Sequence, residues 1–146
     1  MNQTVILLVD DEAPFVETMT KRLGKRSYNV LTAFSGQEAL AELKTAKGAK
    51  VDVIILDVKM PVMDGVETLS EIKRLYPLIE VIMLTGHATI ESGIEGMKLG
   101  AFDYLMKPTD MDHLVAKIEE AGAKKRRHEA KILEARAQMI ALRRGD

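Results

Sequence analysis

The chain has 146 residues, of which 47% are hydrophobic and 29% are charged, and it contains no cysteine. This composition is that of one globular domain of ordinary size, and it excludes disulfide bonds, thiolate metal sites and cysteine nucleophiles. The apolar run from Val5 to Val9 is too short for a signal peptide or a membrane span, so we expect a cytoplasmic protein with no membrane contact.

Charge is distributed unevenly along the chain, whose net charge is −1. Residues 1–122 hold 13 lysines and arginines against 19 aspartates and glutamates, whereas residues 123–146 hold 8 against 3. A solvated helix is the simplest explanation of the basic end. Binding of nucleic acid or of an acidic partner is the alternative.

Five short apolar clusters, rich in valine and isoleucine, predict five β-strands. They cover residues 5–9, 28–34, 51–56, 80–85 and 102–106. Most of them lack a regular alternation of polar and apolar residues. This pattern is typical of parallel strands that are covered on both faces.

The segments between these clusters have the length and spacing of helices. We expect helices over residues 13–26, 35–45, 65–76 and 89–99, and a last helix that begins near 110. Ser35 and Glu38 have the spacing of a capping box at the second of these helices. The fourth is the weakest, because Gly93 and Gly96 each cost a helix about 1 kcal/mol relative to alanine.

Strands that alternate with helices predict an α/β fold, a doubly wound five-stranded parallel sheet with helices on both faces. Such a domain would end near residue 122, yet the helical pattern continues. We therefore expect residues 1–122 to form the domain and residues 123–146 to form a helical extension, as a linker or a dimerisation helix. Its apolar spacing is too short to establish a coiled coil.

Acids, a hydroxyl and a lysine stand where the predicted strands end, and ligands of open parallel sheets bind at that edge. The residues are Asp10, Asp11, Asp57, Thr85 and Lys107. Three carboxylates held close repel one another, and at least one should protonate unless a cation is present. Mg²⁺ suits such oxygen ligands. The set fits phosphoryl transfer to a carboxylate. Helix capping by the paired acids is the structural alternative.

Four segments carry these residues: VILLVDDE, IILDVKMPVMDG, VIMLTGHA and GAFDYLMKP. In order and spacing they resemble the motifs of two-component response regulator receiver domains, over residues 4 to about 122. The resemblance implies a flavodoxin-like sheet of strand order 2-1-3-4-5. It also implies that Asp57 accepts a phosphoryl group from a phosphohistidine on a sensor histidine kinase or phosphotransfer protein.

The resemblance assigns further roles around Asp57. It implies that Asp10, Asp11 and the backbone carbonyl of Lys59 bind Mg²⁺ together with Asp57. Thr85 and Lys107 would hold the phosphoryl oxygens. Such a receiver is not a conventional enzyme, although it assists its own phosphorylation and dephosphorylation.

The resemblance also implies a switch. Tyr104 would change rotamer when Thr85 moves, and the face of the fourth helix, fifth strand and fifth helix would then control a downstream protein effector or dimerisation. A half-buried strand aromatic is the structural alternative for Tyr104. Lys59 and His87 would flank the water that removes the phosphate, and the bond from Lys107 to Pro108 would be cis.

Three other interpretations of the chain remain open at this point. A phosphatase or phosphotransferase acting on a small molecule could use Asp57, and a pseudo-receiver could only dock partners. A flavodoxin-like nucleotide-binding protein needs a loop rich in glycine, serine or threonine after the first strand, where this chain has DDEAP. The tail has no helix-turn-helix pattern, so we expect no direct DNA binding. The chain would be a stand-alone regulator, with a possible homodimer, or a piece of a longer protein.

Overall fold

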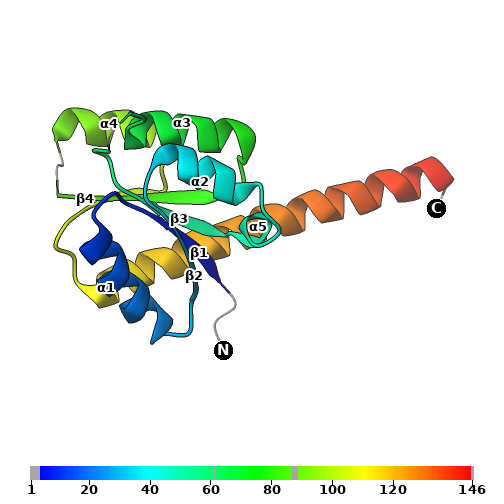
Figure 1. The fold of residues 1–146 in the computed structure, drawn as a ribbon. Helices are drawn as coiled ribbons and strands as arrows, with labels where there is room; N and C mark the ends of the chain where they lie inside the picture. The colour runs from blue at the N-terminus through cyan, green and yellow to red at the C-terminus, as the bar shows by residue number, and fades with distance from the viewer. Residues whose placement is uncertain (1–3, 61, 87–88, 146) are drawn as a thin grey trace.

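The computed structural model describes residues 4–60, 62–86 and 89–145. Helices and strands alternate along the chain, as the sequence predicts (Figure 1). The elements are β1 (Val5–Val9), α1 (Ala13–Gly24), β2 (Asn29–Ala33), α2 (Gly36–Leu43), the 3-10 turn η1 (Gly48–Lys50), β3 (Val53–Leu56), α3 (Gly65–Leu75), β4 (Glu80–Thr85), α4 (Ile90–Lys98), β5 (Asp103–Met106) and α5 (Met111–Arg144).

The five strands form one parallel sheet in the order β2-β1-β3-β4-β5, which confirms the predicted topology. Helices α2, α3 and α4 cover one face of the sheet, and α1 and α5 cover the other (Figure 1). The order along the chain reverses between β1 and β3, the two strands at the centre of the acidic edge. Ligands of doubly wound sheets bind at such a reversal.

Side chains of the central strands alternate between two hydrophobic cores. Leu7 and Ile54 belong to the core beneath α2 and α3, whereas Ile6 and Ile55 belong to the core beneath α1 and α5. All four are buried. Because each such side chain stabilises the fold by roughly 1.5–3 kcal/mol on burial, the strands that carry the acidic edge are held firmly from both sides.

The predicted capping box at α2 is only half formed. Ser35 Oγ accepts a hydrogen bond of 3.1 Å from the backbone nitrogen of Glu38, as expected for an N-cap. The Glu38 carboxylate, however, accepts from the backbone nitrogen of Phe34 at 3.2 Å. The long glutamate side chain thus reaches one residue beyond the position that the motif predicts.

The two glycines of α4 make room for an aromatic ring. A Cβ at Gly93 or Gly96 would lie 3.8 Å from ring carbons of Tyr104 on β5, within van der Waals contact. Thr89 and Ser92 form a capping box at the start of the helix, which supports its first turn. The weak helix predicted from the glycines therefore forms, and its glycines lie against Tyr104.

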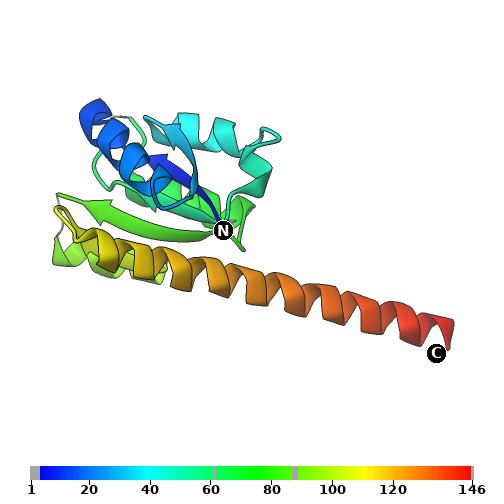
Figure 2. The same ribbon diagram turned by 90° about the horizontal axis from the view of Figure 1, so that it is seen from below.

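Helix α5 continues without interruption from the domain into the tail (Figure 2). Lys125 is its last buried residue and bonds to Asp52 at 3.1 Å and to Glu129 at 3.3 Å. Beyond Glu129 the described residues are exposed, apart from the half-buried Ala141. Within the described part of the chain, no helix combines the length and the hydropathy needed to cross a membrane.

Candidate functional site

Backbone hydrogen bonds fix two aspartates at the carboxyl end of the sheet. The backbone nitrogen of Asp57 donates to the carbonyl oxygen of Val9 at 3.0 Å, and the backbone nitrogen of Asp10 donates to the carbonyl oxygen of Ala33 at 3.1 Å. These bonds extend the pairing of β3 with β1, and of β1 with β2, by one residue. The side chains of Asp10 and Asp57 are therefore both buried at the sheet edge.

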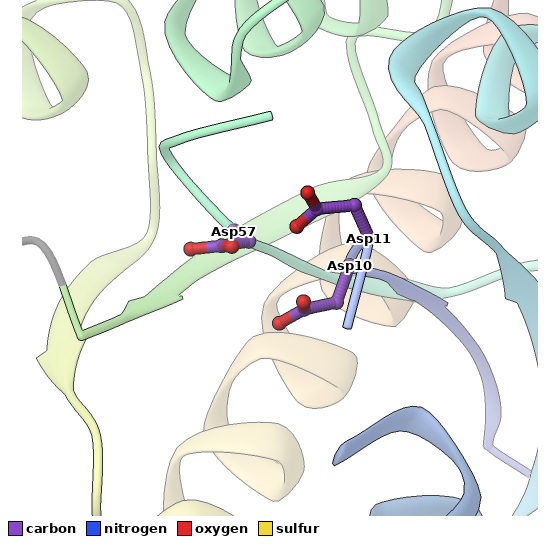
Figure 3. Close-up of side chains that lie close together, drawn as sticks. All are labelled: Asp10, Asp11 and Asp57. Carbon is purple, nitrogen blue, oxygen red and sulfur yellow. The ribbon is translucent and has the colours of Figure 1, made fainter. Parts of the chain in front are cut away.

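The carboxylates of Asp10, Asp11 and Asp57 form one acidic cluster (Figure 3). One oxygen from each lies within 4.8 Å of the others, and only Asp11 is exposed. Carboxylate oxygens at this spacing fit a hard divalent cation, with Asp11 on the side that is open to solvent. The structure thus brings together the three acids that the sequence places at two separate strand ends.

The electrostatics of Asp10 reflect its burial. Burial raises the pKa of its carboxyl above the usual value, and the nearby charge of Asp57 acts in the same direction. Hydrogen bonds from Lys107 and from the backbone nitrogen of Glu12 oppose this rise without cancelling it. Positive charge near the cluster, from Lys107 or from a bound cation, therefore favours the ionised form of Asp10.

Lys107 joins the cluster from the loop after β5. Its Nζ donates to Asp10 Oδ2 at 2.6 Å and to Glu12 Oε1 at 3.1 Å. Burial lowers the pKa of this amine, but the bonds and charges of the acids outweigh burial and raise the pKa above its usual value. The amine therefore stays protonated. The bond from Lys107 to Pro108 is cis, as predicted.

Thr85 is buried at the end of β4, the strand next to β3. Its carbonyl oxygen accepts a hydrogen bond of 2.8 Å from the backbone nitrogen of Lys107, which ties the ends of β4 and β5 together. Lys59 is exposed in the loop after Asp57. His87 lies outside the residues that the structure describes.

The loop after β3 turns back sharply on the acidic edge. Val58 donates its backbone N–H to Asp57 Oδ1 at 2.9 Å, and Gly65 donates to the carbonyl oxygen of Val58 at 2.6 Å. Asp64 caps α3 by accepting from the backbone nitrogen of Glu67 at 2.9 Å. The start of α3 therefore helps to hold the Asp57 carboxylate in place.

Tyr104 is half-buried on β5 and contacts the first turn of α4. Its hydroxyl shares a hydrogen bond of 2.6 Å with Ser92 Oγ, which also belongs to the capping box with Thr89. The sequence prediction missed Ser92, although a Thr-x-x-Ser spacing before a helix could have identified it. It also missed the contacts of Glu12 and Phe15 with Lys107, for which the sequence holds no distinctive pattern.

Exposed apolar side chains gather around Tyr104. A shallow, open groove of about 550 Å³ is lined by Gly93, Ile94, Met97, Lys98, Asp103 and Tyr104. Ile94 and Met97 on α4 and Met106 on β5 are about half exposed or more. Such an apolar patch beside a polar rim is typical of a surface that contacts another protein.

Comparison with known proteins identifies the chain. The family model for the response regulator receiver domain matches residues 6–119. The chain is 38% identical over 138 residues to the transcriptional regulatory protein ZraR of Salmonella typhimurium, which covers 94% of this chain and 30% of the relative. It is 34% identical over 121 residues to the DNA-binding transcriptional regulator NtrC of the same organism, covering 83% of this chain and 25% of that protein.

Solved structures show the same fold. A response regulator receiver domain protein from Clostridium thermocellum superposes with a TM-score of 0.79 and 37% identity, covering 84% of this chain and 97% of that one. These matches favour a receiver over a nucleotide-binding protein or a small-molecule phosphatase. The chain spans less than a third of the curated relatives named above. It belongs to the response regulator receiver domain family, whose members are phosphorylation-controlled signalling switches of two-component systems.

Proposed function

We propose that Asp57 is the phosphoacceptor of this receiver, with a sensor histidine kinase or phosphotransfer protein as donor. A carboxylate oxygen of Asp57 would attack the phosphorus, and the P–N bond would break as the donor imidazole leaves with its electron pair. One observation carries this role. The buried Asp57 shares a 4.8 Å cluster with Asp10 and Asp11, and Lys107 is hydrogen-bonded to the same cluster.

We propose Mg²⁺ as the cation of this cluster. Asp10, Asp11, Asp57 and the backbone carbonyl of Lys59 would hold it, because hard oxygen donors with one solvent-facing side suit this ion. When bound, it neutralises charge on the acids and on the phosphoryl oxygens. A bound cation would favour the ionised form of Asp10, whose pKa is raised by burial.

Residues on the neighbouring strands would complete phosphoryl binding. Thr85 would donate its hydroxyl to one phosphoryl oxygen, and the protonated amine of Lys107 would move from Asp10 to bind another. Lys59 would border the water that later hydrolyses the acyl phosphate. The chain would thus assist its own phosphorylation and dephosphorylation, with Asp57 itself as the group that is modified. The test of this function is phosphoryl uptake from acetyl phosphate, which we expect to require both Mg²⁺ and Asp57.

Tyr104 is the proposed switch residue, and the face of α4, β5 and α5 is the proposed output surface. The apolar groove beside Tyr104 supports a protein effector as the partner of this face. The hydroxyl of Tyr104 shares a hydrogen bond with Ser92 Oγ. Phosphorylation would move Thr85, and Tyr104 would then leave Ser92 and loosen the start of α4.

Tyr104→Phe is expected to speed phosphoryl uptake about fivefold, because it removes the hydrogen bond to Ser92, worth about 1 kcal/mol. Uptake would proceed from the minor conformation in which this bond is broken, so the rate rises with the population of that conformation. Ser92→Ala should give the same acceleration, and the double variant should add nothing. Uptake rates from acetyl phosphate, together with amide exchange of residues 89–96, measure this coupling. Tyr76→Phe is the control, and unchanged rates in Tyr104→Phe would refute the switch contact.

Residues 123–146 are the proposed linker or dimerisation helix beyond the receiver domain of residues 1–122. Exposed apolar side chains along the protruding helix support pairing with a second copy. They are Ile132, Leu133, Met139, Ile140 and Leu142. Sedimentation equilibrium of chains ending at 122 and at 146, before and after phosphorylation, measures this pairing. A monomer in every sample would leave only the linker role. The cytoplasm is the proposed compartment, and no direct DNA contact is proposed for the tail.

A further inference from the structure

Three side chains contact the amine of Lys107. Asp10 and Glu12 accept its hydrogen bonds, and the ring of Phe15 lies beneath it with its centroid 3.9 Å from Nζ. The Lys107 side chain is only 13% exposed, although it lies at the edge of the sheet. The amine is thus held by α1 and by the residues just before it.

The ring of Phe15 offers the amine something that an aliphatic side chain would not. Phe15 lies in the first turn of α1 and packs at the margin of the core beneath α1 and α5, a place that leucine would fill as well. The face of an aromatic ring, however, attracts a cation through its quadrupole. The position of Nζ over the ring indicates that this attraction holds Lys107 on the α1 side.

The contacts of the Lys107 amine and the acidic cluster have one carboxylate in common. Asp10 Oδ2 accepts the 2.6 Å bond from Lys107, and Asp10 is also one of the three acids of the cluster. A cation that binds Asp10 must therefore compete with the lysine amine for this carboxylate. Any side chain that stabilises the amine in this position therefore weakens binding of the cation to Asp10.

We propose that Phe15 is a positioning residue that holds the Lys107 amine against Asp10 and Glu12 and thereby weakens binding of Mg²⁺ to the acidic cluster. This role rests on the proposed function of the cluster and of Lys107. Phe15 contacts neither the proposed metal nor the phosphoryl group, and it acts only through the lysine. The first turn of α1 thus sets how readily the site accepts its cation.

Isothermal titration calorimetry of the unphosphorylated protein with MgCl₂, at constant ionic strength, tests this role. Phe15→Leu keeps an apolar side chain but removes the ring face. We expect it to lower the Mg²⁺ dissociation constant about two- to fivefold, the factor that a partly exposed cation–π contact implies. Phe15→Tyr keeps the ring face and should retain the wild-type constant. Met19→Leu, a volume-conserving change on the same helix, controls for altered packing of α1.

A double-variant cycle distinguishes positioning of the Lys107 amine from a general effect on the fold. Once Lys107→Ala has removed the amine, Phe15→Leu should no longer change the Mg²⁺ dissociation constant. Equal constants for wild type and Phe15→Leu would overturn the role of Phe15, as would an effect that persists without Lys107. Phosphoryl uptake by the wild type from acetyl phosphate at saturating Mg²⁺ separates this failure from failure of the proposed function, because it tests Asp57 and the acidic cluster whether or not Phe15 positions Lys107.

Discussion

Asp57→Asn is expected to take up no phosphoryl group from acetyl phosphate, whereas the wild type gains one per chain when Mg²⁺ is present. An amide cannot replace the carboxylate as a nucleophile, although it has the same shape. Its oxygen can still accept the 2.9 Å hydrogen bond from the backbone nitrogen of Val58. The fold should persist, because the change also removes one of three mutually repelling carboxylates. Intact-protein mass spectrometry measures the uptake.

Asp64→Asn is the matched control for this prediction. Asp64 lies in the same loop and caps α3, and asparagine caps helices as well as aspartate does. This variant should therefore be phosphorylated like the wild type. Uptake that survives in Asp57→Asn would place the acceptor at another residue. A wild type that gains no phosphoryl group would favour a pseudo-receiver that only docks partners.

Gly65→Ala is expected to destabilise the fold and to slow phosphoryl uptake together. A Cβ at Gly65 would overlap the carbonyl oxygen of Asp57 and lie 2.6 Å from the Cα of Val58. Both are backbone atoms, so the loop after β3 must shift rather than a side chain. Overpacking of this kind costs about 1–3 kcal/mol, which lowers the melting temperature by roughly 2–12 °C in a domain of this size.

Gly24→Ala controls for the general effect of a methyl group. A Cβ at Gly24 meets nothing within 4 Å, and Gly24 ends α1. Alanine there should leave stability unchanged or raise it by up to about 1 kcal/mol, because it restricts the unfolded chain. Thermal unfolding and the uptake rate are measured for both variants. Equal stability of the two would contradict the close approach of α3 to Asp57.

Continuous apolar runs allowed the sequence to predict the strands well. The bounds of β1 and β4 agree with the predicted ranges, because each run of buried residues is also the paired segment. The prediction was too long for β3, since Val51 is buried but follows the 3-10 turn η1 outside the sheet. Burial alone does not distinguish a strand from the buried loop residue before it.

The acidic cluster could be predicted because the carboxyl ends of parallel strands lie at one edge of the sheet. Residues that follow those ends are close together whatever their side-chain conformations. The contacts of Lys107 could not, because its long side chain could have pointed to several acids or to solvent. Its choice of Asp10, Glu12 and Phe15 depends on the position of α1, which packing of the whole domain sets. The bond between Tyr104 and Ser92 likewise depends on how closely α4 approaches β5.

Mapping the modified residue tests the assignment of Asp57 most directly. Wild-type protein is phosphorylated with acetyl phosphate and Mg²⁺, and the acyl phosphate is reduced with borohydride, which converts the modified aspartate to homoserine. Peptide sequencing by mass spectrometry should then find homoserine at position 57 and at no other aspartate. Homoserine at Asp10, Asp11 or Asp64 in place of position 57 would contradict the account.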